Sequence, residues 1–222
     1  MKPKVLKAHL SRGEIDSVLF SKGLSGPRAG PIFQGMFIQT EATPNPDVMK
    51  FLPGREVLGT GSRELASPEE AVVSPLATAL FALGDVSRVF LGPDFLTVTR
   101  SPDIEWAHLK APILAAIMDH YTSGKPVLTG DDETQDDTVY DEDTLQIVAE
   151  IKDLLDTRVR PAVAQDGGDI VFNRFDVESG TVYLHMRGAC SGCPSSAATL
   201  KAGVENMLRH YVPEVMRVEQ TL

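Results

Sequence analysis

The sequence predicts an α+β protein made of two small α/β sandwich domains, with a β-β-α-β-β-α order in the N-terminal one and an α-β-β-α-β order in the C-terminal one. Short strand-like segments are interleaved with segments of helical periodicity, and clusters of Pro and Gly separate them. One acidic stretch divides the chain. With 222 residues, 42% of them hydrophobic, the chain can bury one or two cores.

The acidic stretch sets the predicted domain boundaries. Residues 129–143 carry eight acidic residues, no basic ones and almost nothing to bury. Because like charges repel, we expect a flexible, extended linker. A metal-binding acidic loop is the alternative, but the carboxylates lack the Gly and the closing Glu of a calcium loop. The linker separates an N-terminal domain, 36–128, from a C-terminal domain, 144–222, and we expect 1–35 to be a disordered extension.

The N-terminal domain is predicted as two hairpins, each followed by a helix. Strands near 37–39 and 48–52 surround the turn Thr43-Pro-Asn-Pro46. Two capping signals, Ser67-Pro-Glu-Glu70 and Ser74-Pro75, predict a helix that ends at Gly84. The second hairpin turns at Gly92-Pro93-Asp94, between strands 86–91 and 95–99, and a helix near Trp106 presents Ile113, Ile117 and Tyr121 on one face.

The C-terminal domain begins with an amphipathic helix for which Asp143 is the expected cap. Strands are expected at 170–175 and at 181–187, where Val182, Leu184 and Met186 alternate with polar residues. A loop, 188–194, leads into a second helix that Pro213 ends. A short last strand, 215–218, completes the domain.

Composition excludes several classes of function. The net charge of −10 disfavours a phosphate backbone as partner, so no nucleic acid is expected. No apolar run is long enough to cross a bilayer, so no membrane is expected either. The only two cysteines are three positions apart and cannot make a disulfide framework, which favours a reducing compartment.

Those two cysteines, Cys190 and Cys193, are the candidate ligands. They lie in a Gly-flanked loop, and Pro194 begins the next helix, whose first amides point back toward the sulfurs. The helix dipole stabilises thiolates and a negative cluster by up to about 1 kcal/mol in an exposed setting. Since Ser191 and Gly192 are small, we expect the sulfurs to be accessible.

The same loop fits two kinds of chemistry. A C-x-x-C pair serves iron-sulfur or other metal sites and thiol-disulfide enzymes alike. Against the redox reading, no aromatic residue precedes Cys190, and the predicted element order lacks a parallel strand-helix-strand crossover. Clusters and structural zinc usually take four ligands, so two copies of the chain or external thiols must complete a metal site.

Other candidate ligands have ordinary interpretations. His185 is expected on the polar face of its strand beside Tyr183 and Arg187, and His210 near a helix C-terminus. His108 and His120 belong to the other domain and have no companion ligands. The segment Asp166-Gly-Gly-Asp169 could hold a hard cation, but two glycines between acids more often make a tight turn.

These motifs resemble a known family. The run Gly188-Ala-Cys-Ser-Gly-Cys-Pro-Ser-Ser-Ala-Ala-Thr-Leu-Lys201, with Gln165-Asp-Gly-Gly-Asp169 upstream, resembles the Nfu domain, the C-terminal domain of NifU-type proteins. Met36-Phe-Ile-Gln-Thr-Glu-Ala-Thr-Pro-Asn-Pro46 and Leu91-Gly-Pro-Asp-Phe95 resemble the N-terminal domain of mitochondrial and bacterial Nfu proteins. The resemblance covers about 36–222.

The resemblance implies a carrier, not an enzyme. It implies a 4Fe-4S cluster shared between two subunits, bound by Cys190 and Cys193 of each, and a homodimer or higher oligomer when the cluster is bound. Its partners would be apo iron-sulfur client proteins and upstream cluster scaffold proteins. The implied location is the cytoplasm for a bacterial chain and the mitochondrial matrix for a eukaryotic one. The chain has no separate U-type scaffold domain with its own cysteines, which favours transfer over assembly, and the N-terminal domain is assigned to partner docking.

Overall fold

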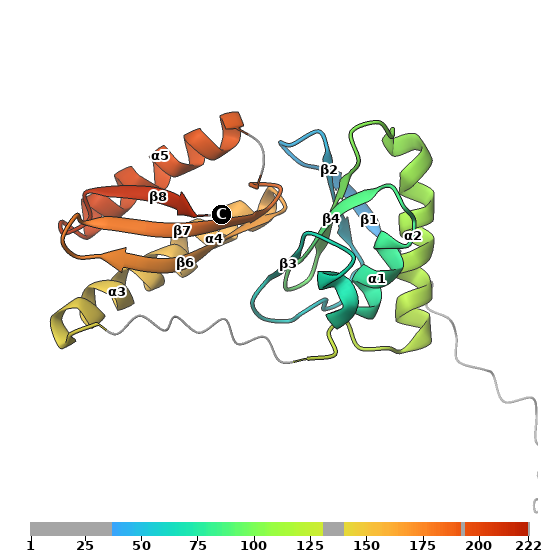
Figure 1. The fold of residues 1–222 in the computed structure, drawn as a ribbon, viewed down its shortest axis with the longest axis horizontal. Helices are drawn as coiled ribbons and strands as arrows, with labels where there is room; N and C mark the ends of the chain where they lie inside the picture. Colours follow the sequence, from blue (N-terminus) through green and yellow to red (C-terminus); the bar gives the residue numbers. More distant parts are fainter. Residues whose placement is uncertain (1–36, 131–139, 192–193, 222) are drawn as a thin grey trace, which may run out of the picture. The chain divides into compact units, whose positions relative to one another are not determined.

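The computed structural model describes residues 37–130, 140–191 and 194–221 (Figure 1). By its contacts, the chain from Met36 to Leu222 forms one compact unit. Within it lie two sheets, each with its own helices and its own hydrophobic core. We call β1 to α2 the N-terminal module and α3 to β8 the C-terminal module.

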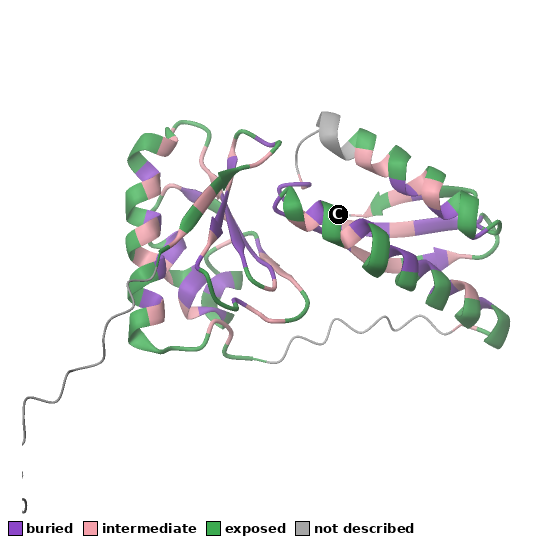
Figure 2. Ribbon diagram, turned by 180° about the vertical axis from the view of Figure 1, so that it is seen from behind, coloured by how far each residue is buried: buried purple, intermediate pink, exposed green. Residues whose placement is uncertain are grey.

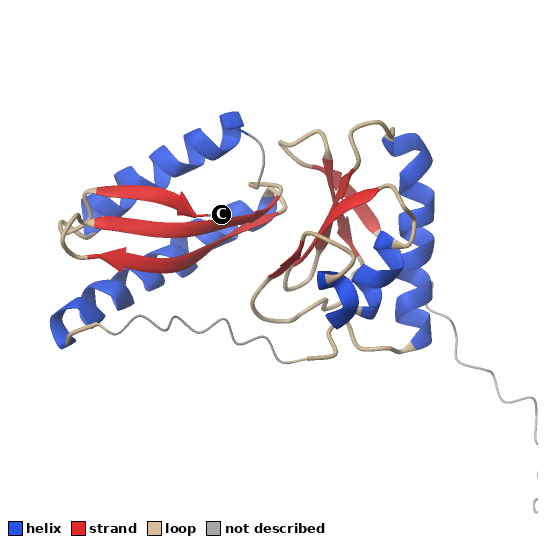
Figure 3. Ribbon diagram, viewed as in Figure 1, coloured by secondary structure: helices blue, strands red, loops and turns tan. Residues whose placement is uncertain are grey.

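The N-terminal module is a five-stranded antiparallel sheet in the order β1-β2-β5-β4-β3, with its helices on one face (Figure 3). Its elements are β1 (Gln39–Ala42), β2 (Val48–Leu52), β3 (Arg63–Leu65), the 3₁₀ turn η1 (Glu70–Val73), α1 (Pro75–Phe81), β4 (Val86–Leu91), β5 (Leu96–Arg100) and α2 (Trp106–Ser123). We call the face opposite α1 and α2 the outer face.

Local sequence explains the two central strands of this sheet. Gly92 N donates to Phe95 O at 2.8 Å and closes the β4–β5 hairpin at the predicted turn. A Cβ on Gly92 would lie 2.8 Å from the Phe95 ring, so only glycine fits. In β4 the pairing register shifts between Val86 and Arg88, which leaves Ser87 as the extra residue of a bulge.

The core of the N-terminal module lies between the sheet and its helices. In Figure 2 the buried residues, in purple, gather in the strands and in α1. Leu96 and Val98 of β5 alternate with outward residues, as a half-covered sheet requires. From α2, Leu109, Ile113 and Ile117 are buried against them.

The C-terminal module is a three-stranded sheet in the order β6-β7-β8. Its elements are α3 (Glu142–Leu154), the π-helical segment η2 (Leu155–Val159), α4 (Arg160–Gln165), β6 (Gly168–Asp176), β7 (Thr181–Gly188), α5 (Pro194–Tyr211) and β8 (Arg217–Thr221). β6 and β7 are antiparallel, whereas β7 and β8 are parallel. Val182, Leu184 and Met186 face the core, as their alternation predicts.

The α+β class and the two sandwiches are confirmed, with local differences. β3 was not predicted, and the helix expected to end at Gly84 is divided into η1 and α1, with Ser74 Oγ accepting from Ala77 N at the start of α1. Asp141, not Asp143, caps α3 by accepting from Thr144 N. The last strand lies at Arg217–Thr221, later than expected.

The acidic stretch falls mostly on 131–139, outside the described residues, so the linker remains a prediction. At its described start, Thr129 N and Oγ1 donate to Val73 O at 2.8 and 3.0 Å. The predicted disordered extension, 1–35, also lies outside the described residues. No helix in the described parts of the chain has the length and apolar character needed to span a membrane.

Candidate cysteine-loop site

The cysteine loop begins where β7 ends. Gly188 is the last residue of β7 and has a positive φ of 66°, which favours glycine. Ala189 N then donates to Gly167 O, and Ser191 N to Gly188 O, both at 3.0 Å. These bonds fold the start of the loop back over the turn that precedes β6.

The Asp166-Gly-Gly-Asp169 segment forms that turn, as predicted. Gly167 has a φ of 82°, and Gly168 pairs with Gly188 at the end of the β6–β7 ladder. A Cβ on Gly168 would lie 2.7 Å from Cys190 Sγ and 2.8 Å from Arg187 O. The missing side chain of Gly168 therefore makes the space that the Cys190 sulfur fills. The interpretation from sequence did not connect these two motifs, although paired glycines signal close backbone approach.

The expected accessibility of the thiols is wrong for Cys190. Its side chain is buried, with 6% of the residue exposed, and it belongs to the hydrophobic core of the C-terminal module. The small neighbours Ser191 and Gly192 suggested an open loop, but the backbone bond from Ala189 to Gly167 turns Cys190 inward against Gly168. Cys193 and Gly192 lie outside the described residues.

The helix after the loop is long enough to have a dipole. α5 runs over 18 residues from Pro194, and Val204 and Leu208 bury one of its faces in the core. The positive end of its dipole follows directly on the cysteine loop, where it favours thiolate and other negative charge.

Asp169 is committed to an ion pair. Its two carboxylate oxygens accept from Arg160 Nε at 2.8 Å and Nη2 at 2.9 Å. The hydrogen bond to Asp169 is the main cause that raises the pKa of Arg160, and burial opposes it. Over the described residues, no group of three or more His, Cys, Asp and Glu side chains could hold a metal ion. The turn interpretation of this segment thus fits better than a hard-cation site.

Among the described residues, no hydrogen bond joins a histidine to the start of the cysteine loop. His185 lies on the polar strand face, as predicted, with Nε2 2.8 Å from Asn173 Nδ2 and Nδ1 2.8 Å from Thr221 Oγ1. Burial, with Arg187 as a smaller cause, lowers the pKa of His185. His210 is in the last turn of α5, as predicted. His120 is buried in the N-terminal module.

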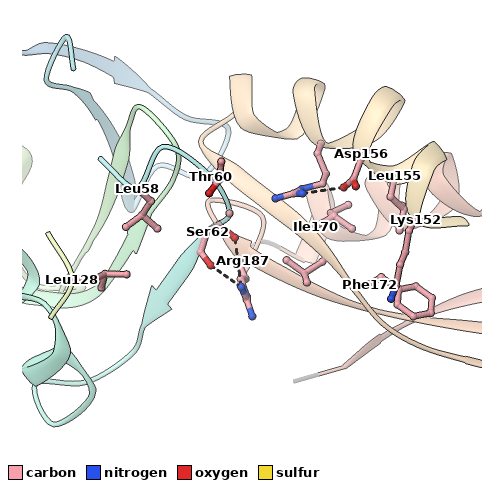
Figure 4. A pocket seen from close by; sticks show the side chains of 13 residues that line it. Leu58, Thr60, Ser62, Leu128, Lys152, Leu155, Asp156, Ile170, Phe172 and Arg187 are labelled. Carbon is pink, nitrogen blue, oxygen red and sulfur yellow. Dashed lines mark hydrogen bonds and ion pairs between the residues drawn. The ribbon is translucent and has the colours of Figure 1, made fainter. Parts of the chain in front are cut away.

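A cavity of about 450 Å³ lies near the loop but not at Cys190 (Figure 4). It is lined by Leu58, Thr60, Gly61, Ser62, Leu128, Lys152, Leu155, Asp156, Arg160, Ile170, Val171, Phe172 and Arg187. Arg187 reaches Ser62 at its edge, and Arg160 is paired with Asp156. Two of its three lining cations, Arg160 and Arg187, thus already have partners in the structure.

One argument against the thiol-disulfide reading is also wrong. β7, α5 and β8 form the parallel strand-helix-strand crossover that the sequence was thought to lack. The sequence position of β8 was placed correctly to within a few residues, but its direction depends on contacts that no local pattern encodes. The topology therefore does not count against a thiol-disulfide enzyme.

The fold and the loop define an α+β protein with a cysteine-bearing turn between a strand and a long helix. Two family models match it: "Scaffold protein Nfu/NifU N terminal" over residues 38–124 and "NifU-like domain" over 151–219. NifU-like protein 5, mitochondrial, of Arabidopsis thaliana is 53% identical over 186 residues, which cover 83% of this chain and 68% of that protein. The human NFU1 iron-sulfur cluster scaffold homolog, mitochondrial, is 48% identical over 84% of this chain and 72% of its own length.

Among solved structures, a NifU-like protein from Saccharomyces cerevisiae matches with a TM-score of 0.40 and 25% identity, over 43% of this chain and 87% of that one. The chain belongs to the Nfu/NifU-like family, with an Nfu-type N-terminal region followed by a NifU-like domain. The family expected from the motifs is therefore confirmed.

Proposed function

We propose that this chain carries an iron-sulfur cluster on the loop 188–194 and delivers it to apo-proteins, with Cys190 and Cys193 as ligands. The observation that carries the proposal is membership of a family whose relatives are named iron-sulfur cluster scaffolds, in a chain whose only two cysteines are in this loop. The proposed role is that of a carrier, without a catalytic group.

The chemistry of the loop supports a cluster as cargo. Thiolates are the usual ligands of iron-sulfur clusters, and the start of α5 stabilises their charge. One chain provides two thiolates, whereas a 4Fe-4S cluster takes four. We therefore propose a 4Fe-4S cluster shared by two copies, related by a two-fold axis that presents the same loop from each.

The buried position of Cys190 adds one requirement. A thiol with 6% of its residue exposed cannot reach a cluster shared with a second copy unless the loop opens. Loading and release are then coupled to a local opening of residues 188–191. The partners proposed are upstream scaffold proteins and apo client proteins, in mitochondria if the chain is eukaryotic, as the names of its relatives suggest.

Anaerobic reconstitution tests the function directly. Iron and sulfide are counted per chain, and Mössbauer spectroscopy identifies the cluster. We expect about one 4Fe-4S cluster per two chains by the four-ligand rule, and none in the Cys190→Ala and Cys193→Ala double variant. A normal amount of cluster in that variant would rule out these ligands.

Disulfide reductase activity is measured on the same preparation. A dithiol enzyme would take up little iron and would reduce disulfides, which is the result that would favour the alternative function. Activation of an apo 4Fe-4S enzyme in the presence of an external chelator then separates transfer from release. If the chelator stops activation, the cluster passes through solution and the carrier role is wrong.

A further inference from the structure

The outer face of the N-terminal sheet carries a row of side chains that crosses all five strands. Strand register places Glu41, Lys50, Thr97, Phe90 and Glu64 opposite one another in sequence across β1, β2, β5, β4 and β3. No helix of the N-terminal module covers this face (Figure 3). Yet Thr97 and Phe90 are each 1% exposed and Lys50 is 7% exposed. These three side chains are therefore buried by residues from outside the N-terminal module.

The C-terminal module supplies that cover, beginning with the end of α4. Lys50 Nζ donates to Ala164 O at 2.9 Å and to Gln165 O at 3.2 Å. A cation at the C-terminal carbonyls of a helix also complements the negative end of its dipole. Lys50 has Glu41 as a second partner at 3.5 Å, so its charge is matched on both sides.

Two glycines allow close contact with the middle of the row. A Cβ on Gly167 would lie 3.0 Å from Thr97 Cγ2, and a Cβ on Gly188 would lie 3.1 Å from Phe90 Cδ1. Both glycines have positive φ, so they satisfy a backbone requirement and a packing requirement together. The turn before β6 and the end of β7 thus fit the row as a complementary surface.

The far end of the row holds the cysteine loop itself. Glu64 Oε1 accepts from Gly188 N at 3.1 Å, and Arg88 donates to Ser191 Oγ. Arg88 and Glu64 also form an ion pair at 3.3 Å. The two bonds to the loop lie on either side of Cys190, so the loop cannot turn Cys190 outward without losing at least one of them.

A second set of contacts borders the first. Ser62 Oγ donates to Asp169 Oδ2 at 2.5 Å. Arg187 Nη1 donates to Ser62 O at 3.0 Å, as Figure 4 shows. Asp169 and Arg187 come from the first and second strands of the C-terminal sheet, close to Gly168 and Gly188. Both sets of contacts therefore come from the turn before β6 and the end of β7.

We propose that the outer face of the N-terminal sheet is a docking surface for the cysteine-loop corner of the same chain, residues 164–169 and 187–191. Docking through Glu64 and Arg88 stabilises the closed loop in which Cys190 is buried. Docking and the closure of the loop do not depend on the proposed function. Where the loop carries a cluster, as proposed above, undocking precedes loading, and the N-terminal module is the element that controls access to Cys190.

Docking is tested on the full-length apo chain. Amide ¹⁵N relaxation gives one rotational correlation time for the two modules if they are docked and two shorter ones if they move independently. In parallel, iodoacetamide alkylation of Cys190 is followed by mass spectrometry with fragment ions that locate the modified residue, because Cys190 and Cys193 lie in one tryptic peptide, 188–201. Independent tumbling in the unmodified chain would overturn the proposal.

Three variants weaken the contact in different ways. Glu64→Gln keeps size but removes the charge, Arg88→Ala removes the bond to Ser191, and Thr97→Glu places a carboxylate against Gly167. Each should raise the alkylation rate of Cys190 about 10-fold or more, because the first two weaken charge-assisted bonds to the loop and the third clashes with the turn at Gly167. Since all three positions lie on the outer face, the core of the N-terminal module is left intact.

Arg55→Ala is the matched control. Arg55 stacks on Tyr121 in the same module, 5.2 Å from the ring, and takes no part in the row. The alkylation rate of Cys190 in the Arg55→Ala variant should equal that in the unmodified chain. Equal rates in all four variants would overturn the control of Cys190 by docking, even if the modules tumble as one body.

Cluster reconstitution separates this inference from the proposed function. Faster cluster uptake by Glu64→Gln and Arg88→Ala supports both. If docking is observed and no variant binds a cluster, the proposed function fails while docking stands. If clusters load at the same rate in docked chains and in undocked variants, access control is wrong while the carrier function stands.

Discussion

At the scale of single residues, Gly168 links the glycine turn to the cysteine loop. A Cβ at this position would lie 2.7 Å from the Cys190 sulfur, so any side chain would occupy the space that the sulfur fills. Burial of Cys190 is thus a property of two positions that are 22 residues apart in the chain. Substitutions at Gly168 and at Cys190 should therefore change the stability of the module in different ways.

Gly168→Ala should destabilise the C-terminal module by about 1–3 kcal/mol, as overpacking of a close contact does. The added Cβ would lie 2.7 Å from Cys190 Sγ and 2.8 Å from the carbonyl oxygen of Arg187, which cannot move without breaking the ladder. Denaturant unfolding monitored by circular dichroism measures the loss. Displacement of the sulfur should also speed alkylation of Cys190.

Gly203→Ala is the control for this substitution. Gly203 lies within α5, and a Cβ there meets nothing within 4 Å. Alanine in an open helical position should stabilise the module by about 0.5–1 kcal/mol. If Gly168→Ala and Gly203→Ala both lose stability, the close contact at Gly168 is not the cause of the destabilisation.

Cys190 itself should tolerate alanine better than serine. Cys190→Ala removes one sulfur from the core and should cost about 1 kcal/mol, whereas Cys190→Ser buries a hydroxyl and should cost about 1–3 kcal/mol. Thermal unfolding of the apo chain tests the order. Equal stability of both variants with the unmodified chain would indicate that the thiol is exposed in solution.

At the scale of elements, the end of α2 carries a buried histidine. His120 is 5% exposed, and Nε2 has no hydrogen-bond partner among the described residues. Burial, with Lys125 as a smaller cause, lowers the pKa of His120 below its usual 6.5. The neighbouring ring of Tyr121 is 5.3 Å away and adds no charge. The folded module therefore favours the neutral imidazole.

This shift predicts the pH dependence of the N-terminal module. As the pH falls below 6.5, the unfolded chain takes up a proton on this residue and the folded module does not, so stability decreases until the folded pKa is passed. Trp106, the only tryptophan, reports on unfolding of this module by fluorescence. His120→Leu should flatten the dependence between about pH 7.5 and 5.5. An unchanged slope in that variant would assign the dependence to other groups.

At the scale of the whole molecule, cluster binding and association should be linked. Because each chain offers two thiolates, the loaded form should sediment as a dimer or a higher multiple, and the apo form mainly as a monomer at micromolar concentration. Dilution should then promote cluster loss. Anaerobic analytical ultracentrifugation at several concentrations measures both effects.

The Cys193→Ala chain is the control for this linkage, since it should stay monomeric under the same conditions. A monomer that keeps a full cluster would contradict the shared site. It would indicate that external thiols such as glutathione complete the ligand shell.

Much of this molecule could be predicted from local sequence. Gly92-Pro93-Asp94 predicted the β4–β5 hairpin, and Pro194 predicted the start of α5, because turn and cap signals depend on adjacent residues. β3 has only three residues and too little pattern to recognise. The parallel direction of β8, the burial of Cys190 and the row from Glu41 to Glu64 all depend on contacts between distant segments, which alternation and spacing do not encode.

The bulge in β4 determines which changes in chain length the sheet can absorb. Val86 and Val89 both point into the core although three positions separate them, because Ser87 is the extra residue between Val86 and Arg88. A homologous strand without this residue would alternate regularly and would still direct Arg88 and Phe90 outward. An insertion or deletion after Val89 would instead invert the phase of the strand and turn part of the docking row into the core. Length variation among natural relatives is therefore expected at position 87 and not in the four residues that follow it.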